Sequence, residues 1–389
     1  MPLIEKPEAK PLRPEFSSGP CAKRPGWDIK QVVCTAYLGR SHRANGPQSQ
    51  IRDVLGLTKE ILEIPENYKV GLVPGSNTGA FEMAMWTLLG KLPVDLFAWE
   101  NFGLEWVNDV VKQLKLQDFR VTSASYGSLP DFTTLRNKSD ACFTWNGTTS
   151  GARVPNADWI PDDREGLVLC DATSAVFGQT IDWKKLDATT FSWQKAMGGE
   201  AAHGILVLSP KAIKRLKTYT PDRPLPKVFR LTKNGKIKEE IFLGETINTP
   251  SMFCIADALD SLRWIQEIGG VKNTVERAIT NFQILQNWID KQDWIENLVD
   301  VKAHRSNTSV CVKIIAKEFQ NLTQDQQRQF VKNFVSLLEE HRVAYDINGH
   351  RAAPPGLRIW CGATVESADI VALLPWLEWA FHKTTQEFP

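Results

Sequence analysis

The sequence predicts an α/β fold in which a large domain with a mostly parallel central sheet is followed by a smaller α+β domain. Between about residues 49 and 215, short apolar runs alternate with helical patterns and short polar connections. From about residue 265 the pattern changes to long helices with strand-like segments between them. A chain of 389 residues is also longer than one hydrophobic core usually supports. We therefore expect a large domain over residues 1–264, which includes an N-terminal arm, and a small domain over residues 265–389.

The elements expected in the large domain begin with an amphipathic helix over residues 51–61. Two further helical patterns cover residues 80–89 and 106–114. Between and after the helices lie continuous apolar runs bounded by turn residues, which are typical of strands buried on both faces of a parallel sheet. These runs predict strands at residues 69–73, 95–99, 141–145, 166–170, 189–193 and 204–208.

The small domain is expected to contain long helices. Val271, Val275 and Ile279 recur at helical spacing, and a second helical pattern runs from residue 330 to residue 338. Residues 309–315 and 357–360 are strand-like. Most aromatic side chains in these helices are interpreted as core packing.

Composition excludes several classes of partner. The chain has 46 Lys and Arg residues against 45 Asp and Glu residues, so no overall positive field attracts nucleic acid or an anionic membrane. The first residues lack the apolar core of a signal peptide, and no stretch approaches the length of a membrane span. The seven cysteines are scattered without CxxC spacing, which indicates reduced packing residues and no metal site. We expect a cytoplasmic protein.

Two residues that follow predicted strands are candidates for chemistry. Asp171 ends the apolar run GLVLCD, and an acid at the carboxyl end of a strand faces the crevice where α/β proteins bind ligands. On this segment alone, a helix N-cap or turn aspartate is an equal alternative. Lys195 follows the strand predicted at 189–193 and precedes the Gly198-Gly199 turn. A lone lysine is usually a solvated surface cation, so its interpretation depends on this setting.

The order and spacing of these residues resemble a known family. Asp171 and Lys195 are separated by 195 − 171 = 24 residues, and with their strands they resemble the fold-type I enzymes that use pyridoxal 5′-phosphate (PLP), in the aminotransferase class V branch. The resemblance implies that Lys195 carries PLP as a Schiff base and that Asp171 pairs with the protonated pyridine nitrogen. The anionic partner keeps the ring cationic, so the ring can withdraw electrons from the substrate. The lysine amine then acts as a general base and acid.

The same resemblance assigns the remaining cofactor contacts. VPGSNTG, residues 73–79, lies between a predicted strand and a helix, where backbone N–H groups can hold a phosphate. Thr148 corresponds to the threonine that contacts the phenolic oxygen of PLP. Phe102 falls where the family stacks an aromatic ring on the pyridine, with core packing as its alternative. The expected phosphate ligands are Ser76, Asn77 and Thr78, with Thr173 and Gln194 as added donors.

Three further segments resemble the phosphoserine aminotransferase group of this family: FSSGP at residues 16–20, the His42-Arg43 pair, and His350-Arg351 with Arg358 seven residues later. The resemblance implies that both His-Arg pairs bind a substrate phosphate and that Arg358 binds the α-carboxylate. Guanidinium groups suit both anions because they bind them through two parallel hydrogen bonds. Taken singly, each His-Arg pair is more often a solvated or helix-capping pair.

The resemblance also implies a homodimer with shared active sites, because Asn248-Thr249 match a segment that reaches the neighbouring subunit's PLP phosphate. The chain departs from the common pattern in three places. Thr78 stands where many members have an arginine, the AAPPG loop before Arg358 is one residue longer, and Ala196-Met197 follow the lysine. A divergent subgroup is therefore expected.

The expected reaction is reversible amino transfer between glutamate and 3-phosphohydroxypyruvate, which gives O-phosphoserine for serine biosynthesis. A related phosphorylated keto acid of pyridoxine biosynthesis fits the same clamp. The first alternative is another class V aminotransferase, of the serine or alanine–glyoxylate type, which has no need of two His-Arg pairs. A cysteine desulfurase is disfavoured because Gln194 stands where that family places a histidine. A catalytically silent PLP-fold binding protein is disfavoured by Lys195, Asp171 and Arg358.

Overall fold

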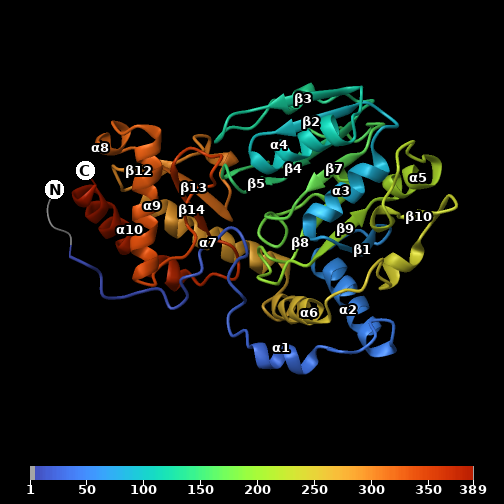
Figure 1. Ribbon diagram of the computed structural model, residues 1–389, viewed down its shortest axis with the longest axis horizontal. Helices are drawn as coiled ribbons and strands as arrows, with labels where there is room; N and C mark the ends of the chain where they lie inside the picture. Colours follow the sequence, from blue (N-terminus) through green and yellow to red (C-terminus); the bar gives the residue numbers. More distant parts are fainter. Residues whose placement is uncertain (1–4, 389) are drawn as a thin grey trace.

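The computed structural model describes residues 5–388 and contains two parts, each built on its own sheet (Figure 1). The large sheet has seven strands in the order β1-β9-β8-β7-β4-β2-β3. Strand β9 is antiparallel to both of its neighbours, and the other pairs are parallel, so every strand except β9 runs in one direction. The strands are β1 (Lys69–Pro74), β2 (Val94–Ala98), β3 (Phe119–Ser123), β4 (Asp140–Thr144), β7 (Val168–Asp171), β8 (Ala188–Ser192) and β9 (His203–Leu208).

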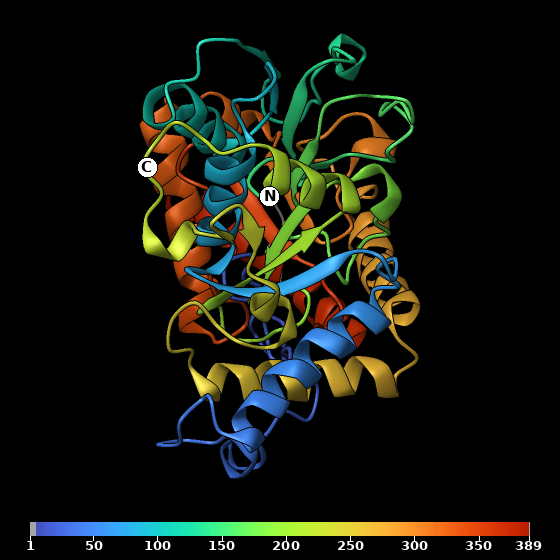
Figure 2. The ribbon, with the colours of Figure 1, turned by 90° about the vertical axis from the view of Figure 1, so that its right-hand side faces the viewer.

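Helices cover both faces of the large sheet (Figures 1 and 2). Alternate side chains of one strand belong to different cores: Ile205 and Val207 of β9 to one, and Leu206 and Leu208 to the other. This two-sided burial explains why the strands read as continuous apolar runs. The helices of this part are α1 (Ile29–Thr35), α2 (Asn45–Ile61), α3 (Ser76–Leu88), α4 (Asn101–Asn108), α5 (Pro210–Thr218) and α6 (Met252–Glu267).

The smaller part has an antiparallel sheet in the order β12-β13-β14. Its strands are β12 (Ile295–Asn297), β13 (Ser309–Ile314) and β14 (Gly356–Trp360), and its helices are α7 (Val271–Ile289), α8 (Lys317–Gln320), α9 (Gln324–Glu340) and α10 (Ser367–Glu387). Four two-residue strands complete the description: β5 (Asn146–Gly147), β6 (Ala152–Arg153), β10 (Thr232–Lys233) and β11 (Lys236–Ile237).

The predicted fold class is confirmed, and each predicted strand overlaps an observed one. Strand β3 was not predicted, because it lies at the edge of the sheet and three of its five side chains are half-buried while two are exposed. The helix predicted over residues 106–114 was wrong in its bounds. The α-helix begins at Asn101, after its N-cap Glu100, and a π-helical turn over Asp109–Gln113 replaces its predicted second half.

The N-terminal arm makes its first described contacts with the smaller part. It was grouped with the large domain, but the indole of Trp376 donates a hydrogen bond to the Ala9 carbonyl, and the Leu12 N–H donates to Asp369. Backbone bonds then link Pro14 to Tyr345 and Phe16 to Trp360. These contacts fasten the arm to the smaller part before it crosses to the large one. The boundary predicted after residue 264 falls inside α6, which continues to Glu267, and the division itself stays a prediction.

Candidate active site

The direction of the strands gathers the predicted residues at one edge of the large sheet. Because β1, β2, β4, β7 and β8 are parallel, their carboxyl ends lie at the same edge. The residues that follow them are the loop before α3, the start of α4, the segment 145–151, Asp171 and Lys195. Segment 146–151 also contacts the smaller part, since the Ser306 N–H donates to the Gly151 carbonyl and Ser309 Oγ donates to the Thr148 carbonyl, 2.7 Å away. The candidate site therefore lies at the junction of the two parts.

Lys195 is buried just beyond the end of β8. Its amine donates a hydrogen bond to the Ser18 carbonyl of the N-terminal arm. Burial, with the positive charge of Arg358 as a smaller cause, lowers the pKa of Lys195, which favours a neutral and nucleophilic amine. The following Gly198 has φ +67°, and a Cβ there would lie 2.3 Å from the Ala22 carbonyl, so this glycine lets the arm pass over the lysine loop.

Asp171 ends β7, as predicted, and its carboxylate is held at both oxygens. The N–H and hydroxyl of Thr173 donate to Oδ1 at 3.0 and 2.7 Å, and the indole N–H of Trp106 donates to Oδ2 at 3.1 Å. Burial raises the pKa of Asp171, and these bonds oppose the rise. Thr173 was expected to donate to a phosphate, but both of its donor groups serve Asp171. Thr173 thus binds the carboxylate in this structure, and its contact with a phosphate stays a prediction.

The predicted phosphate loop forms the N-terminus of α3. Gly75 and Ser76 have φ values of +85° and +53°, and α3 begins at Ser76. A Cβ on Gly79 would lie 2.3 Å from the Pro74 carbonyl, so only glycine fits where the loop closes. The Ser76 N–H donates to the Ala202 carbonyl, while the N–H groups of Asn77 and Thr78 lie in the first turn, where a helix can bind an anion. Asn77 is buried and Thr78 is exposed, and both stay predicted ligands.

Thr148 lies in a buried hydrogen-bond network that the sequence did not reveal. Its hydroxyl donates to Ser174 Oγ at 2.8 Å, and the amide of Asn146 donates to the same oxygen at 2.9 Å. Ser174 donates in turn to the Asn146 carbonyl. Ser174 is three residues beyond Asp171, so the segment DATS was the only sequence signal available for it. The network fixes the Thr148 side chain beside the cofactor aspartate's loop.

His350 lies near Phe102, and both Arg358 and Arg351 lie close enough to His350 to lower its pKa. Arg358 lies on β14, and the structure gives it no ion pair with a carboxylate among residues 5–388. Its positive charge lowers the pKa of His350, with burial as the larger cause. The His350 ring lies 6.2 Å from the half-buried Phe102 ring, measured between centroids. Arg351 is exposed. The Arg358 guanidinium, which lies close enough to Lys195 to lower the pKa of its amine, suits an anionic substrate.

His42 and Arg43 do not join this group within one chain. They lie in the loop between α1 and α2, at the lower edge of Figure 1, away from β14. Arg43 is exposed, and its backbone N–H donates to Ser41 Oγ. Asn248 and Thr249 are likewise exposed, just before α6. The positions of these four residues fit the predicted dimer but do not test it.

Two buried residues near the site escaped sequence reasoning. Trp106 donates to Asp171, and Glu100 is the N-cap of α4, where its carboxylate accepts bonds from the Gly103 N–H at 2.8 Å and the Thr149 hydroxyl at 2.7 Å. Burial raises the pKa of Glu100 to about 7. Trp106 comes four residues after Phe102, so a helix that began at residue 101 would have placed both rings on one face.

The residues present fit PLP. Lys195 offers a buried amine, Asp171 a carboxylate, and the start of α3 an anion site. Asn77 Oδ1, Gln194 Oε1 and Arg358 Nε are buried polar atoms without a hydrogen-bond partner in the described structure, which is typical of a site that a ligand completes. The donors and acceptors therefore match a phosphate, a ring nitrogen and an aldehyde. Bound there, PLP supplies an electron-withdrawing ring to the substrate amine.

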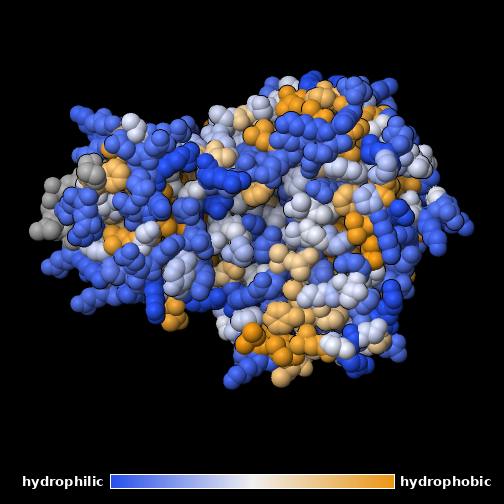
Figure 3. All heavy atoms as spheres, viewed as in Figure 1, coloured by the Kyte–Doolittle hydropathy of each residue, from blue (hydrophilic) through white to orange (hydrophobic). Residues whose placement is uncertain are grey.

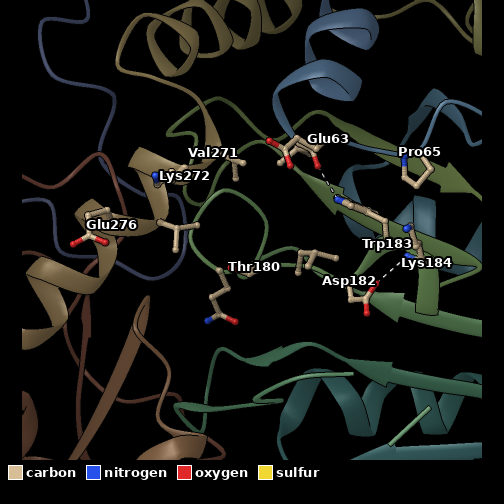
Figure 4. A pocket seen from close by; sticks show the side chains of 13 residues that line it. Glu63, Pro65, Thr180, Asp182, Trp183, Lys184, Val271, Lys272 and Glu276 are labelled. Carbon is tan, nitrogen blue, oxygen red and sulfur yellow. Dashed lines mark hydrogen bonds between the residues drawn. The ribbon is translucent and has the colours of Figure 1, made fainter. Parts of the chain in front are cut away.

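A cavity of about 780 Å³ lies elsewhere, between the turn after α2, residues 179–184 and the start of α7 (Figure 4). Figure 4 shows Asp182, Lys184, Lys272 and Glu276 around it, with charges of both signs. None of the predicted site residues lines it. We assign no chemistry to this cavity.

Comparison with known proteins decides the family. Residues 130–360 match the family model described as aminotransferase class-V, which is more than half of the chain. The chain belongs to the class V aminotransferases. It is therefore a PLP-dependent transaminase, as the lysine, the aspartate and the helix N-terminus indicated.

Relatives and solved structures place the chain more closely within this class. It is 50% identical to a phosphoserine aminotransferase of Methanosarcina mazei over 97% of this chain and 99% of that relative. A phosphoserine aminotransferase of Corynebacterium glutamicum is 27% identical over 75% of this chain and 77% of the relative. Among solved structures, a phosphoserine aminotransferase from Bacillus circulans aligns with a TM-score of 0.78 at 19% identity, over 95% of this chain and 99% of that one. An alanine–glyoxylate aminotransferase from Nostoc aligns almost as well, with a TM-score of 0.77 at 20% identity over 97% of both chains. The fold alone therefore does not choose the substrate.

Proposed function

We propose that this class V aminotransferase is a phosphoserine aminotransferase that acts in serine biosynthesis. It transfers the amino group of glutamate to 3-phosphohydroxypyruvate, giving O-phosphoserine and 2-oxoglutarate, and the reaction is reversible. The identity of 50% to a phosphoserine aminotransferase over almost the whole chain supports the assignment. A related phosphorylated keto acid of pyridoxine biosynthesis presents the same two anionic ends.

The single observation that carries the substrate assignment is that the charges of Arg358 and Arg351 add to burial in lowering the pKa of His350, whose ring lies 6.2 Å from that of Phe102. Arg358 on β14 is assigned the α-carboxylate, since it lies close enough to Lys195 to lower the pKa of its amine. His350 and Arg351 are assigned the phosphate of phosphoserine, or the side-chain carboxylate of glutamate. A donor without a second anion, such as alanine, leaves this half of the clamp empty.

Each residue of the site is assigned a separate role in the reaction. Arg358 orients the substrate so that its Cα faces Lys195. Lys195 Nζ would remove the Cα proton and release it on the far side of the substrate nitrogen, two bonds away, and its lowered pKa favours the neutral amine that this requires. With PLP bound, the Asp171 carboxylate would hold the proton on the pyridine nitrogen and Thr148 would contact the phenolic oxygen. The smaller part contacts the other side of the site through Ser309.

The proposal includes a homodimer in which the partner's His42-Arg43 loop and Asn248-Thr249 segment complete each site. Exposed apolar side chains support this. Ile29 and Val33 of α1 and the following Leu38 are 52%, 41% and 53% exposed. Figure 3 shows a hydrophobic area at the lower edge, where Figure 1 places α1. Such a patch beside a basic loop is typical of an interface.

A cytoplasmic location is also part of the proposal. Its support is that all seven cysteines are free thiols, five of them buried. Within residues 5–388, no helix is both long enough and apolar enough to cross a membrane.

The substrate is tested by comparing phosphoserine, serine and alanine as amino donors to 2-oxoglutarate under identical conditions. We expect kcat/KM for phosphoserine to exceed that for the unphosphorylated donors by at least about 100-fold, because charge-assisted hydrogen bonds to the phosphate contribute about 1.5–3 kcal/mol each. Equal or faster turnover of serine or alanine would show that the clamp is wrongly assigned and would favour the glyoxylate type. Absence of bound PLP after reconstitution would refute the cofactor assignment as well.

A further inference from the structure

The indole of Trp106 has a contact that the reaction described above does not use. Trp106 is 6% exposed, and its Nε1 lies 3.1 Å from Asp171 Oδ2. We propose that Trp106 is a positioning residue for the cofactor ring, because it fixes the Asp171 carboxylate so that one lone pair of Oδ2 faces the ring nitrogen. The inference rests on the proposed role of Asp171 as partner of that nitrogen.

The number of acceptor positions on Asp171 supports this role. An ionised carboxylate has about four lone-pair positions, two on each oxygen. The N–H and the hydroxyl of Thr173 occupy both positions on Oδ1, and Trp106 occupies one position on Oδ2. The Asn77 side chain is a further hydrogen-bonding influence, and it also lowers the pKa of Asp171. Of the two positions on Oδ2, Trp106 thus leaves at most one for the ring nitrogen.

The chemistry of the indole makes this contact selective for the carboxylate. An indole N–H donates and cannot accept, and it binds an ionised carboxylate oxygen more strongly than the neutral acid. Asp171 is buried, and burial is the largest influence on its pKa and raises it. A hydrogen bond to the charged form opposes that rise. Without the indole, the charged carboxylate would lose one of its donors, and neutral forms of Asp171 and the ring nitrogen would become more favourable.

The donor is rigid because of its place on α4. Its ring packs against Phe81, with 4.9 Å between ring centroids. Phe102 lies four residues earlier on the same helix, so the two rings share one face. Glu100 caps the helix and binds Thr149, next to Thr148. One helix thus carries the residue assigned to the ring face and the residue that holds the partner of the ring nitrogen.

The test replaces the N–H group while keeping the shape of the side chain. Trp106→Phe removes the donor, and incorporation of benzothienylalanine at the same position exchanges only the N–H for sulfur. Trp183→Phe is the matched control, because its indole is 7% exposed and donates to the Leu62 carbonyl at 2.8 Å, away from the predicted site residues. Each protein is loaded with PLP that carries nitrogen-15 in the ring, and the protonation of that nitrogen is followed by NMR against pH.

We expect the ring nitrogen to be protonated at neutral pH in the unaltered enzyme and in Trp183→Phe. In both Trp106 variants its titration should move down by about one pH unit, with PLP bound about tenfold more weakly. The value of kcat should fall by a similar factor while KM for phosphoserine changes little.

Three results would overturn the inference. The titration of the ring nitrogen could be the same in all proteins. PLP affinity could fall without any change in ring protonation, which would indicate packing alone. The protein with benzothienylalanine could show the same titration of the ring nitrogen as the unaltered enzyme. This variant also provides the test if Trp106→Phe does not fold. An unaltered enzyme that binds no PLP would instead refute the proposed function.

Discussion

The two halves of the candidate site differ in how completely one chain builds them. At the cofactor end, Lys195, Asp171 and the Thr148–Ser174 network are buried and joined by hydrogen bonds inside a single chain. At the substrate end, Arg351 is exposed, and His42 and Arg43 lie on another side of the molecule. The cofactor end is thus preorganised by the sheet, whereas the substrate end depends on loops.

This difference has a physical origin. Parallel strands bring their carboxyl ends to one edge, so the residues that follow them converge wherever the sheet forms. The arginines predicted to bind the phosphate, Arg43 and Arg351, lie in loops that no sheet positions, whereas Arg358 lies on β14. The chemistry is therefore expected to be robust and the substrate preference easy to alter, which agrees with the similar fit to phosphoserine and alanine–glyoxylate aminotransferases.

The largest effect is expected from Lys195→Ala. Loss of the amine removes the group that moves the Cα proton, so kcat should fall by at least about 10²–10⁴-fold, and the absorption of lysine-bound PLP should disappear. Lys23→Ala is the control. Lys23 lies on the N-terminal arm, pairs with Glu200 and Asp257, and is outside the predicted site. Retention of the absorption band in Lys195→Ala would contradict the cofactor end of the comparison.

A smaller and selective effect is expected at the substrate end. Arg358→Ala should lower kcat/KM for phosphoserine and for alanine alike, by about 10- to 100-fold, because both donors have an α-carboxylate. Arg351→Ala should lower only the value for phosphoserine. Parallel kinetics with the two donors measure this split. If Arg351→Ala weakens alanine as strongly as phosphoserine, the phosphate assignment fails.

Sequence reasoning predicted the cofactor end better than the surroundings that support it. Asp171 and Lys195 could be located at the ends of strands because each follows a run of consecutive apolar residues, which is typical of a buried strand. Trp106 and Ser174 could not, since a buried indole and a serine in a loop look like ordinary packing until their partners are known. The bounds of α4 were wrong because Glu100 was not recognised as an N-cap, and with them the shared face of Phe102 and Trp106 was missed.

The predicted arm shows a second limit. Residues 9–16 carry no pattern that says which part they bind, and their bonds to Asp369, Tyr345 and Trp376 join segments more than 300 residues apart. Contacts of this kind depend on the assembled surface and not on local periodicity. The order of the seven strands in the sheet could not be predicted from the sequence for the same reason, although the alternation of elements indicated a mostly parallel sheet.

The pH dependence of stability tests how much the buried Glu100 carboxylate, next to the cofactor end, destabilises the fold when it is ionised. Burial raises the pKa of Glu100 from 4.5 to about 7, so between these values the folded protein binds more protons than the unfolded one. Its stability should therefore fall as pH rises from 4.5 to 7, by up to about 3 kcal/mol from this group.

Glu100→Gln keeps an acceptor for the Gly103 N–H and cannot titrate, so its thermal midpoint should fall less over this pH range. Exposed Glu267→Gln is the control and should follow the unaltered protein. If the thermal midpoints of all three proteins change equally with pH, ionisation of the buried Glu100 does not destabilise the fold.

The comparison of the two halves is tested most directly by hybrid dimers. Lys195→Ala chains mixed equally with Arg43→Ala chains should recover roughly a quarter of the unaltered activity, because half of the dimers are hybrids and one site in each combines Lys195 with the partner's Arg43. Lys195→Ala mixed with Arg351→Ala should recover none, since both residues belong to the same chain's half of the site. No recovery in the first mixture, or equal recovery in both, would contradict the proposal that the partner's Arg43 completes a site whose Lys195 and Arg351 come from one chain.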